Sequence, residues 1–375
     1  MVRRYLEQTP LRGPLIRLLP LSSLAVLIAA TVAPPSAAPG PTLAMLSTPV
    51  GGERTTLRFQ PTHPGAPLAD VSAELTHRPD AVVLGAVLPG TRTVLATALT
   101  APERDVSWAS TLFRLEAGQP AQPLVDRVYA FTRPLVTPAG RVFVLRGTPG
   151  PDPTDDSISR GELRSDLLTV DEVDPRTAAV RTVYSTKGYL AFLAGALRSE
   201  LVVYRVDPSG AELLAVQVDT GSTRLLTKLA PFARDFSVDS TTGTLYFTQL
   251  SSDGVSWQVE ALQLASGARE VRVSHQQRSA SPHAWPAGGL LHSEGEGGLL
   301  VLGSSGPRTA RRPAGVDVVS GFSSDLAWAI GLHQLEGVLP EPLLLRTATL
   351  EAEPVPSVAG ERVDLAGFVD EGAGR

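Results

Sequence analysis

The sequence predicts an all-β protein, specifically a β-propeller built of four-stranded blades. Runs of about four to eight residues rich in Val, Leu, Thr, Tyr and Phe alternate with Gly, Pro, Asp and Ser, and helical periodicity is scarce after residue 45. The same order of four strands also recurs with a period of about 40 to 50 residues, which is typical of propeller blades. These two observations predict the fold class.

The chain begins with a segment typical of an export leader. Arg3 and Arg4 precede the apolar stretch Leu18–Ala33, which is shorter than the roughly 20 residues that a membrane span needs. A basic start, a short apolar core and small residues after it are the pattern of a signal peptide. Because Pro34 and Pro39 directly follow the candidate cleavage sites, the alternative for residues 1–38 is an uncleaved anchor in the inner membrane.

Residues 39–50 continue a Pro-rich stretch and are expected to form a linker. Residues 51–375 are then expected to form the propeller domain. The clearest set of four strands begins with two strands within Phe236–Gln249. Its third strand is expected at Trp257–Leu264 and its fourth at Arg269–Ser274. Five further sets begin near residues 81, 128, 189, 282 and 316. We expect six blades, and Gly51–His77 is expected to lend a strand that completes the weak last one.

The set at Phe236 resembles the repeat of TolB-like propellers. In that family a Phe-Ser-x-Asp-x-x-Gly-x-x-Leu-x-Phe/Tyr run opens a blade. The residues that match it, with one extra residue before the glycine, are Phe236, Ser237, Asp239, Gly243, Leu245, Tyr246 and Phe247. The match is partial at Pro138–Gly140 and Phe322–Asp325, so seven blades or two β-sandwich domains are the alternatives to six blades. The resemblance concerns architecture, and propellers of this architecture bind, scaffold or catalyse.

The composition limits the compartment and the partners. Two lysines stand against 31 arginines, and neither cysteine nor asparagine occurs, which suggests a GC-rich bacterial gene. Together with the leader, this predicts a periplasmic or secreted protein without disulfides, lipid-modified cysteine or N-glycosylation sequons. The net charge of −5 argues against a nucleic-acid surface. A closed ring without long free edges favours a monomer.

Two groups of residues are candidate metal ligands. Asp152, Asp155 and Asp156 form an acidic loop that could hold calcium, which prefers oxygen ligands. The alternative is a solvated insertion between strands. His283 and His292 could in principle hold zinc, although neither the HExxH motif nor comparably close spacing is present. The alternative is a pair of exposed histidines at turns and strand ends.

No catalytic or cofactor-binding motif is found. The sequence contains no Gly-x-Ser-x-Gly elbow, no phosphate-binding loop and no dinucleotide fingerprint. We therefore expect an exported, non-catalytic propeller without a cofactor that binds a protein or a cell-envelope component. The alternative is a propeller hydrolase or lyase whose site lies in the central channel, because residues from several blades can converge there without forming a sequence motif.

Overall fold

The computed structural model describes residues 41–63, 65–79, 81–100, 106–155, 163–229, 232–276, 282–285, 290–295, 298–303, 306–311, 316, 318–333 and 339–369. The leader at residues 1–38 lies outside these residues, and residues 39–375 form one compact unit. The described residues of this unit are all-β apart from η1 (Val106–Trp108) and the single helical residue Asp155, as the sequence predicts. Among the described residues, no helix has the length and apolar character needed to span a bilayer.

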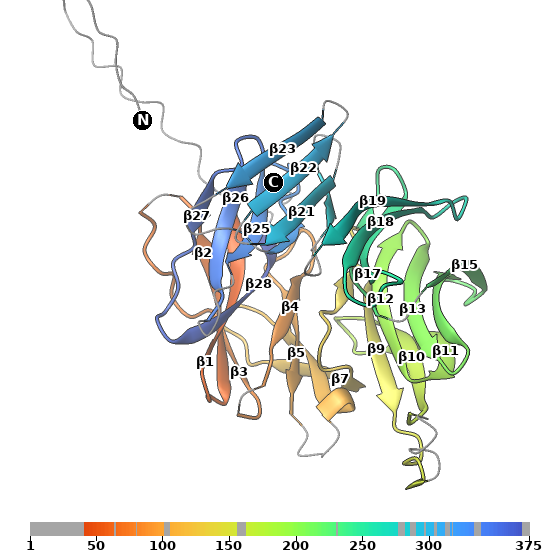
Figure 1. The fold of residues 1–375 in the computed structure, drawn as a ribbon. Helices are drawn as coiled ribbons and strands as arrows, with labels where there is room; N and C mark the ends of the chain where they lie inside the picture. The colour runs from red at the N-terminus through yellow and green to blue at the C-terminus, as the bar shows by residue number, and fades with distance from the viewer. Residues whose placement is uncertain are drawn as a thin grey trace, which may run out of the picture. The chain divides into compact units, whose positions relative to one another are not determined.

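Hydrogen bonds join the strands into five sheets of four strands and one of eight (Figure 1). The eight-stranded sheet consists of two four-stranded halves that are joined at their boundary by the single pair Val128–Arg146. If this pair is set aside, the strands form seven groups of four, which we call blades 1 to 7. The six sets expected from the sequence are blades 2 to 7. The grouping therefore agrees with the seven-blade alternative.

The strands are as follows, in chain order within each blade. Blade 2 contains β4 (Leu84–Val87), β5 (Val94–Leu99), β6 (Ser110–Leu115) and β7 (Gln122–Val128), and blade 3 contains β8 (Leu135–Val136), β9 (Val142–Thr148), β10 (Asp166–Val173) and β11 (Val180–Gly188). Blade 4 contains β12 (Leu190–Leu197), β13 (Glu200–Asp207), β14 (Gly210–Gln217) and β15 (Thr223–Leu229), and blade 5 contains β16 (Ala233–Asp239), β17 (Thr244–Leu250), β18 (Trp257–Gln263) and β19 (Arg269–Gln276). Blade 6 contains β20 (His283–Ala284), β21 (Leu290–Gly295), β22 (Gly298–Gly303) and β23 (Gly306–Arg311), and blade 7 contains β24 (Val318–Phe322), β25 (Trp328–His333), β26 (Glu341–Arg346) and β27 (Ala352–Pro354).

Blade 1 combines the two ends of the described chain. It contains β28 (Glu361–Val369), β1 (Thr42–Pro49), β2 (Arg54–Pro61) and β3 (Ala73–Thr76) in this spatial order (Figure 1). The linker expected at residues 39–50 is therefore wrong for Thr42–Pro49, which is a buried strand whose apolar residues pack on both faces. The segment Gly51–His77 likewise does not complete the last blade, because its strand β2 pairs with β1 and its strand β3 pairs with β2.

The blades close into a propeller-like ring. Among the described residues, buried apolar side chains form seven clusters, and each cluster joins two consecutive blades, including blade 7 to blade 1. The first strand of each blade lies on the inner wall, since β28, β4, β8, β12, β16 and β20 contact one another in succession and β24 contacts β28. The core of this protein is therefore divided among the interfaces between blades.

The ring has two chemically distinct ends. Because neighbouring strands in a blade are antiparallel, the turns from first to second and from third to fourth strand lie at one end, which we call the turn end. The other end carries the connections from second to third strand and those to the next blade. We call it the crossover end. The longest described connection there joins β9 to β10 and contains the acidic insertion.

Four described turns from third to fourth strand share one geometry. In each, a residue with positive φ donates its backbone N–H to the carbonyl four residues earlier: Ala178 to Asp174, Gly221 to Gln217, Gly267 to Gln263 and Leu350 to Arg346. The sequence places Gly221 and Gly267 at matching points of the repeat, and the structure adds Ala178 and Leu350 to them. A side chain in this left-handed conformation costs about 1–2 kcal/mol relative to glycine.

Replacing Ala178 by glycine is therefore expected to stabilise the protein. The gain in the free energy of unfolding should be up to about 1 kcal/mol, because the relief of the left-handed strain is offset in part by the greater freedom of glycine in the unfolded chain. Urea unfolding measures it. The reverse substitution at the equivalent position, Gly221→Ala, should destabilise the protein, because its new Cβ would lie 2.8 Å from the Val183 carbonyl oxygen. A loss of stability in Ala178→Gly would contradict this account.

Candidate functional site

The predicted metal ligands do not form a common site in the described structure. Asp152 is strongly exposed, and its carboxylate lies 3.8 Å from the Arg164 guanidinium. Asp155 ends the described part of the loop, and Asp156 lies outside the described residues. Within the ranges described above, no group of three or more His, Asp or Glu residues is placed to hold a metal ion.

His283 lies on the inner wall, at the start of β20. Its Nδ1 is 3.1 Å from the Ser237 hydroxyl on β16, and its ring meets Phe322 of β24 edge-on at 6.1 Å. Burial lowers the pKa of His283 to about 4, and a hydrogen bond with the Val319 backbone opposes this shift in part. His283 thus connects three blades as a neutral ring. His292 lies on the neighbouring strand β21, and its side chain is outside the described part of the structure.

A second polar link on the inner wall joins blades 1, 2 and 3. Arg133, just before β8, forms a two-pronged ion pair with Asp364 of β28. The same guanidinium donates to the Gly85 carbonyl at 2.7 Å, and the Gly85 amide donates to the Asp364 carboxylate at 2.9 Å. This cluster holds the inner strands β28 and β4 and the start of blade 3 together.

A row of aromatic side chains runs across the crossover half of blades 2 to 5. Consecutive rings have centroids 5.2 to 6.2 Å apart, mostly tilted or edge-to-face, and the row comprises Trp108, Tyr129, Phe192, Tyr204, Phe236 and Phe247. Phe131 branches from it, 5.6 Å from Tyr129. Aromatic pairs at such separations contribute about 0.5–1.5 kcal/mol each beyond their burial. The row gives this end of the ring a rigid apolar floor.

Asp166 holds the base of the acidic insertion on this row. Its buried carboxylate accepts hydrogen bonds from the Trp108 indole at 2.8 Å, the Gly150 amide at 2.9 Å and the Arg164 guanidinium at 2.7 Å. Burial alone would raise the pKa of Asp166, but these three donors bring it below the ordinary value. Both ends of the long connection are thus fixed, one through Gly150 and the other through Arg164.

Gly147 gives a direct test of this anchor. A Cβ at this position would lie 2.4 Å from the Trp108 ring, so Gly147→Ala should displace the indole and weaken its bond to Asp166. We expect a loss of about 1–3 kcal/mol in the free energy of unfolding and a shift in tryptophan emission. Gly321→Ala is the control, because a Cβ there meets no atom within 4 Å. Equal stability of the two variants would contradict the packing described.

Exposed apolar side chains gather at the crossover end. Among the described connections between strands, the large apolar residues that are 50–78% exposed all lie at that end: Val50, Phe131, Leu163, Phe232 and Val255. The corresponding residues in connections at the turn end, Leu68, Val71 and Leu326, are only 37–47% exposed. Phe232 also has a φ of 69°, which is rare and strained for a bulky residue.

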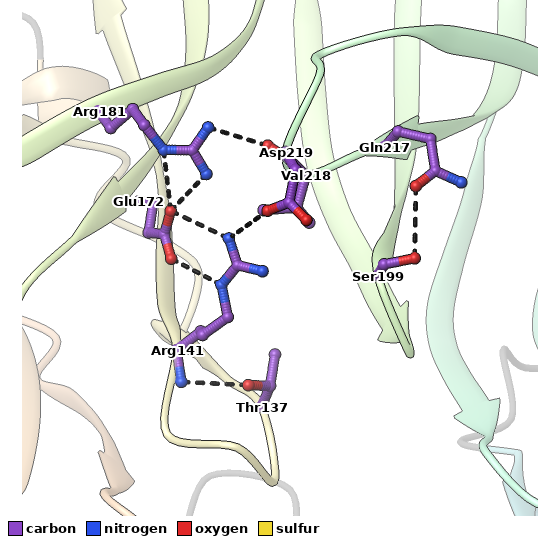
Figure 2. A network of polar contacts seen from close by, with 8 residues as sticks. All are labelled: Thr137, Arg141, Glu172, Arg181, Ser199, Gln217, Val218 and Asp219. Carbon is purple, nitrogen blue, oxygen red and sulfur yellow. Dashed lines mark hydrogen bonds and ion pairs between the residues drawn. The ribbon is translucent and has the colours of Figure 1, made fainter.

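The turn end instead carries charged networks between blades. In Figure 2, the Glu172 carboxylate lies between two guanidinium groups, and bonds of 2.7 Å from Arg141 and 2.6 Å from Arg181 join them. Arg141 also reaches Asp219 of blade 4 at 3.3 Å. The hydrogen bond from Arg141 is the main reason that the pKa of Glu172 lies below its ordinary value. Nearby, Ser199 donates to Gln217 within blade 4 (Figure 2).

Neither a known protein family nor a curated protein matches this sequence. Solved structures do match the fold. A structure of prolyl endopeptidases has a TM-score of 0.54 at 15% identity, over 86% of this chain and 50% of that one. A puromycin-hydrolyzing peptidase of Mycobacterium tuberculosis has a TM-score of 0.50 at 14% identity, over 84% and 55%. TolB from Acinetobacter baumannii has a TM-score of 0.45 at 12% identity, over 86% and 65%.

These likenesses concern the fold alone, because the identities are so low. The chain also spans only about half to two thirds of the length of these three structures. The propeller architecture expected from the repeat at Phe236 is confirmed by the ring of four-stranded blades.

Sequence reasoning missed the residues that distinguish the crossover end. Phe131 and Phe232 each occupy a connection between blades, where an aromatic residue has no strand partner to cover it. Phe232 lies outside the expected strands, whereas Phe131 falls within the segment from residue 128 that was expected to be a strand. Trp108 and Asp166 are far apart in sequence, and no local pattern links an indole to a carboxylate that distant.

Proposed function

We propose that this chain is an exported, non-catalytic propeller that binds a protein partner of the cell envelope through its crossover end. The observation that carries the proposal is the concentration of exposed apolar side chains at that end, above all Phe131 and Phe232. Exposed apolar patches on soluble proteins mark interaction surfaces, and aromatic residues are enriched at the centres of protein interfaces.

The exposure of the Phe232 ring supports this assignment. A bulky residue in the left-handed region is unfavourable, and here the strained backbone holds an aromatic ring in solvent, where it gains no burial. Leu326 at the turn end shares this backbone region with a φ of 58°, so the feature that distinguishes Phe232 is its greater exposure, 69% against 47%. If a partner covers this exposed ring, its removal from water contributes favourable free energy to binding.

The inner wall gives less support to a hydrolase or lyase. Ser237 and His283 resemble a nucleophile and its base in their 3.1 Å contact. However, a base with a pKa of about 4 is far from the value near 7 that favours proton transfer at neutral pH. Arg133 and Asp364 are already paired with each other. The non-catalytic function therefore accounts better for the described residues.

Export is part of the proposal and rests on the basic start and short apolar segment before residue 34. Fractionation of cells that produce the full chain should place the protein in the periplasm or the medium. Its first residue should then lie after one of the small-residue sites near Ala33 and Ala38. A mature protein that starts at Met1 and sediments with the inner membrane would support the anchored alternative. Recovery in the cytosol would overturn export.

Site-specific photocrosslinking tests the binding surface. We expect p-benzoylphenylalanine at Phe131 and at Phe232, introduced one at a time, to give the same covalent adduct with one envelope protein in living cells. Two control positions carry the same probe on other surfaces: Leu225, which is exposed on the outer strand β15, and Leu326 at the turn end. These should give no such adduct.

The partner found in this way allows a quantitative check. Phe131→Asp and Phe232→Asp should each weaken its affinity at least tenfold, because each would replace an apolar contact by a desolvated charge. Leu326→Asp should leave the affinity unchanged. Exported, folded protein that gives no adduct at either phenylalanine, or an equal adduct at Leu326, would refute the assignment of this surface.

A further inference from the structure

The turn end contains a repeated contact between consecutive blades. In each case an arginine of one blade donates to a backbone carbonyl in the next: Arg114 to Pro175 at 3.3 Å, Arg181 to Val218 at 3.0 Å, and Arg224 to Leu264 at 3.2 Å. These contacts cross the interfaces 2/3, 3/4 and 4/5 in order. We call the three pairs the arginine latches. All of them run in one direction around the ring.

The acceptors occupy one position of the repeat. Each carbonyl belongs to the residue three places before the residue with positive φ in the turn from third to fourth strand, namely Ala178, Gly221 or Gly267. Within these turns, the N–H of the positive-φ residue donates to the carbonyl four residues earlier. The next carbonyl, three residues before the positive-φ residue, is therefore left to accept from the arginine of the neighbouring blade. The common turn geometry thus places a hydrogen-bond acceptor for arginine at the same position in each blade.

Carboxylates of the donor's own blade orient the three guanidinium groups. Glu116 pairs with Arg114 at 2.7 Å, Glu172 with Arg181 at 2.6 Å, and Glu200 with Arg224 at 3.5 Å. Figure 2 shows the middle latch, in which Arg181 extends from Glu172 to Val218. A planar guanidinium can satisfy a carboxylate and a carbonyl at once, whereas the single ammonium of lysine matches this geometry less well.

The same three interfaces are also held at the crossover end. At 2/3 the Trp108 indole donates to Asp166 at 2.8 Å. At 3/4 the ring of Tyr129, which lies in the connection from blade 2 and whose amide donates to the Leu145 carbonyl of blade 3 at 2.9 Å, meets Phe192 of blade 4 at 5.6 Å. At 4/5 the Ala233 amide, at the start of β16, donates to the Tyr204 hydroxyl at 3.5 Å, and the Tyr204 ring meets Phe236 at 5.3 Å. Between the two ends of each interface lies one of the apolar clusters.

We propose that blades 2 to 5 form one rigid body because each of their interfaces is fastened at both ends. A hinge movement about either end of an interface would have to break the fastening at the other. This body fixes Phe131, between blades 2 and 3, relative to Phe232, between blades 4 and 5. On the basis of the function proposed above, the latches at the turn end act as positioning groups for the binding surface at the opposite end.

Distance measurements between spin labels test this inference without the partner. The chain has no cysteine, so Phe131→Cys and Phe232→Cys can be labelled cleanly together. In the otherwise unchanged protein we expect one narrow distance distribution. Adding Arg181→Met and Arg224→Met should broaden it at least twofold. Adding Arg176→Met instead, an exposed arginine in a turn of the same kind, should leave the width unchanged.

Hydrogen exchange provides the second measurement. In Arg181→Met the amides of residues 217–222 should exchange at least tenfold faster, while those of the turn at residues 137–141 should not. If the methionine variants fail to fold, Arg181→Lys with Arg224→Lys replaces them and should broaden the distances to a smaller degree. The rigid-body proposal is overturned if the distance distribution between the two labels is broad in the protein with all latches intact. It is equally overturned if the distribution stays narrow after Arg181 and Arg224 are both replaced. Failure of crosslinking at Phe131 and Phe232 would refute the binding surface alone.

Discussion

Lowering the pH from 6.5 to 4 is expected to reduce the free energy of unfolding by up to about 3 kcal/mol through His283 alone. Its pKa of about 4 in the folded protein lies below the ordinary value of 6.5. Between these two values the unfolded chain binds a proton that the folded chain does not, so stability falls as the pH falls, by about 1.4 kcal/mol for each pH unit. The full contribution is present above pH 6.5 and is lost below pH 4.

Urea unfolding at several pH values measures this effect. His283→Gln should be less stable at pH 7, because the contact with Ser237 is altered, but its stability should depend much less on pH between 6.5 and 4. The exposed His63 supplies the control, and His63→Gln should keep the pH dependence of the original protein. Parallel pH profiles for the original protein and His283→Gln would contradict the burial of a neutral imidazole between three blades.

Arg133→Met is expected to lower the free energy of unfolding by about 2–3 kcal/mol. The substitution removes the cation that neutralises Asp364, whose side chain is only 13% exposed. Loss of one partner of a buried ion pair costs more than the pair itself contributes, because the remaining charge stays desolvated. It also removes the bond to the Gly85 carbonyl. Urea unfolding at pH 7 measures the loss.

A double variant separates the buried charge from general packing. In Arg133→Met/Asp364→Asn the isolated charge is gone, while an amide oxygen can still accept from the Gly85 amide. This protein should therefore recover part of the stability that Arg133→Met loses. Arg198→Met, at an exposed position, should change the stability by less than about 0.5 kcal/mol. A double variant less stable than Arg133→Met would show that unpaired charge is not the cause.

The local patterns of the sequence were enough to predict the all-β class and six of the seven blades. Strand runs with period two and the glycine turns at Gly221, Gly243 and Gly267 depend on short stretches of chain, where side-chain alternation and positive φ are set by neighbouring residues. For this reason the expected sets agree with blades 2 to 7. Within the linker expected at residues 39–50, the segment Thr42–Pro49 was misassigned because flanking prolines suggested a linker, although it forms a buried strand.

The pairing of β1 with β28 was decided by the tertiary structure. The two strands are separated by nearly the whole chain, and no local sequence pattern in either strand identifies the other as its partner. The same holds for the polar clusters, since Arg133 with Asp364, and Trp108 with Asp166, meet only when blades close around the inner wall. Composition and local pattern thus determined which segments become strands and where they turn. Closure of the ring decided which charges are buried, which arginines reach the next blade, and which phenylalanines remain exposed, because these depend on contacts between residues distant in sequence.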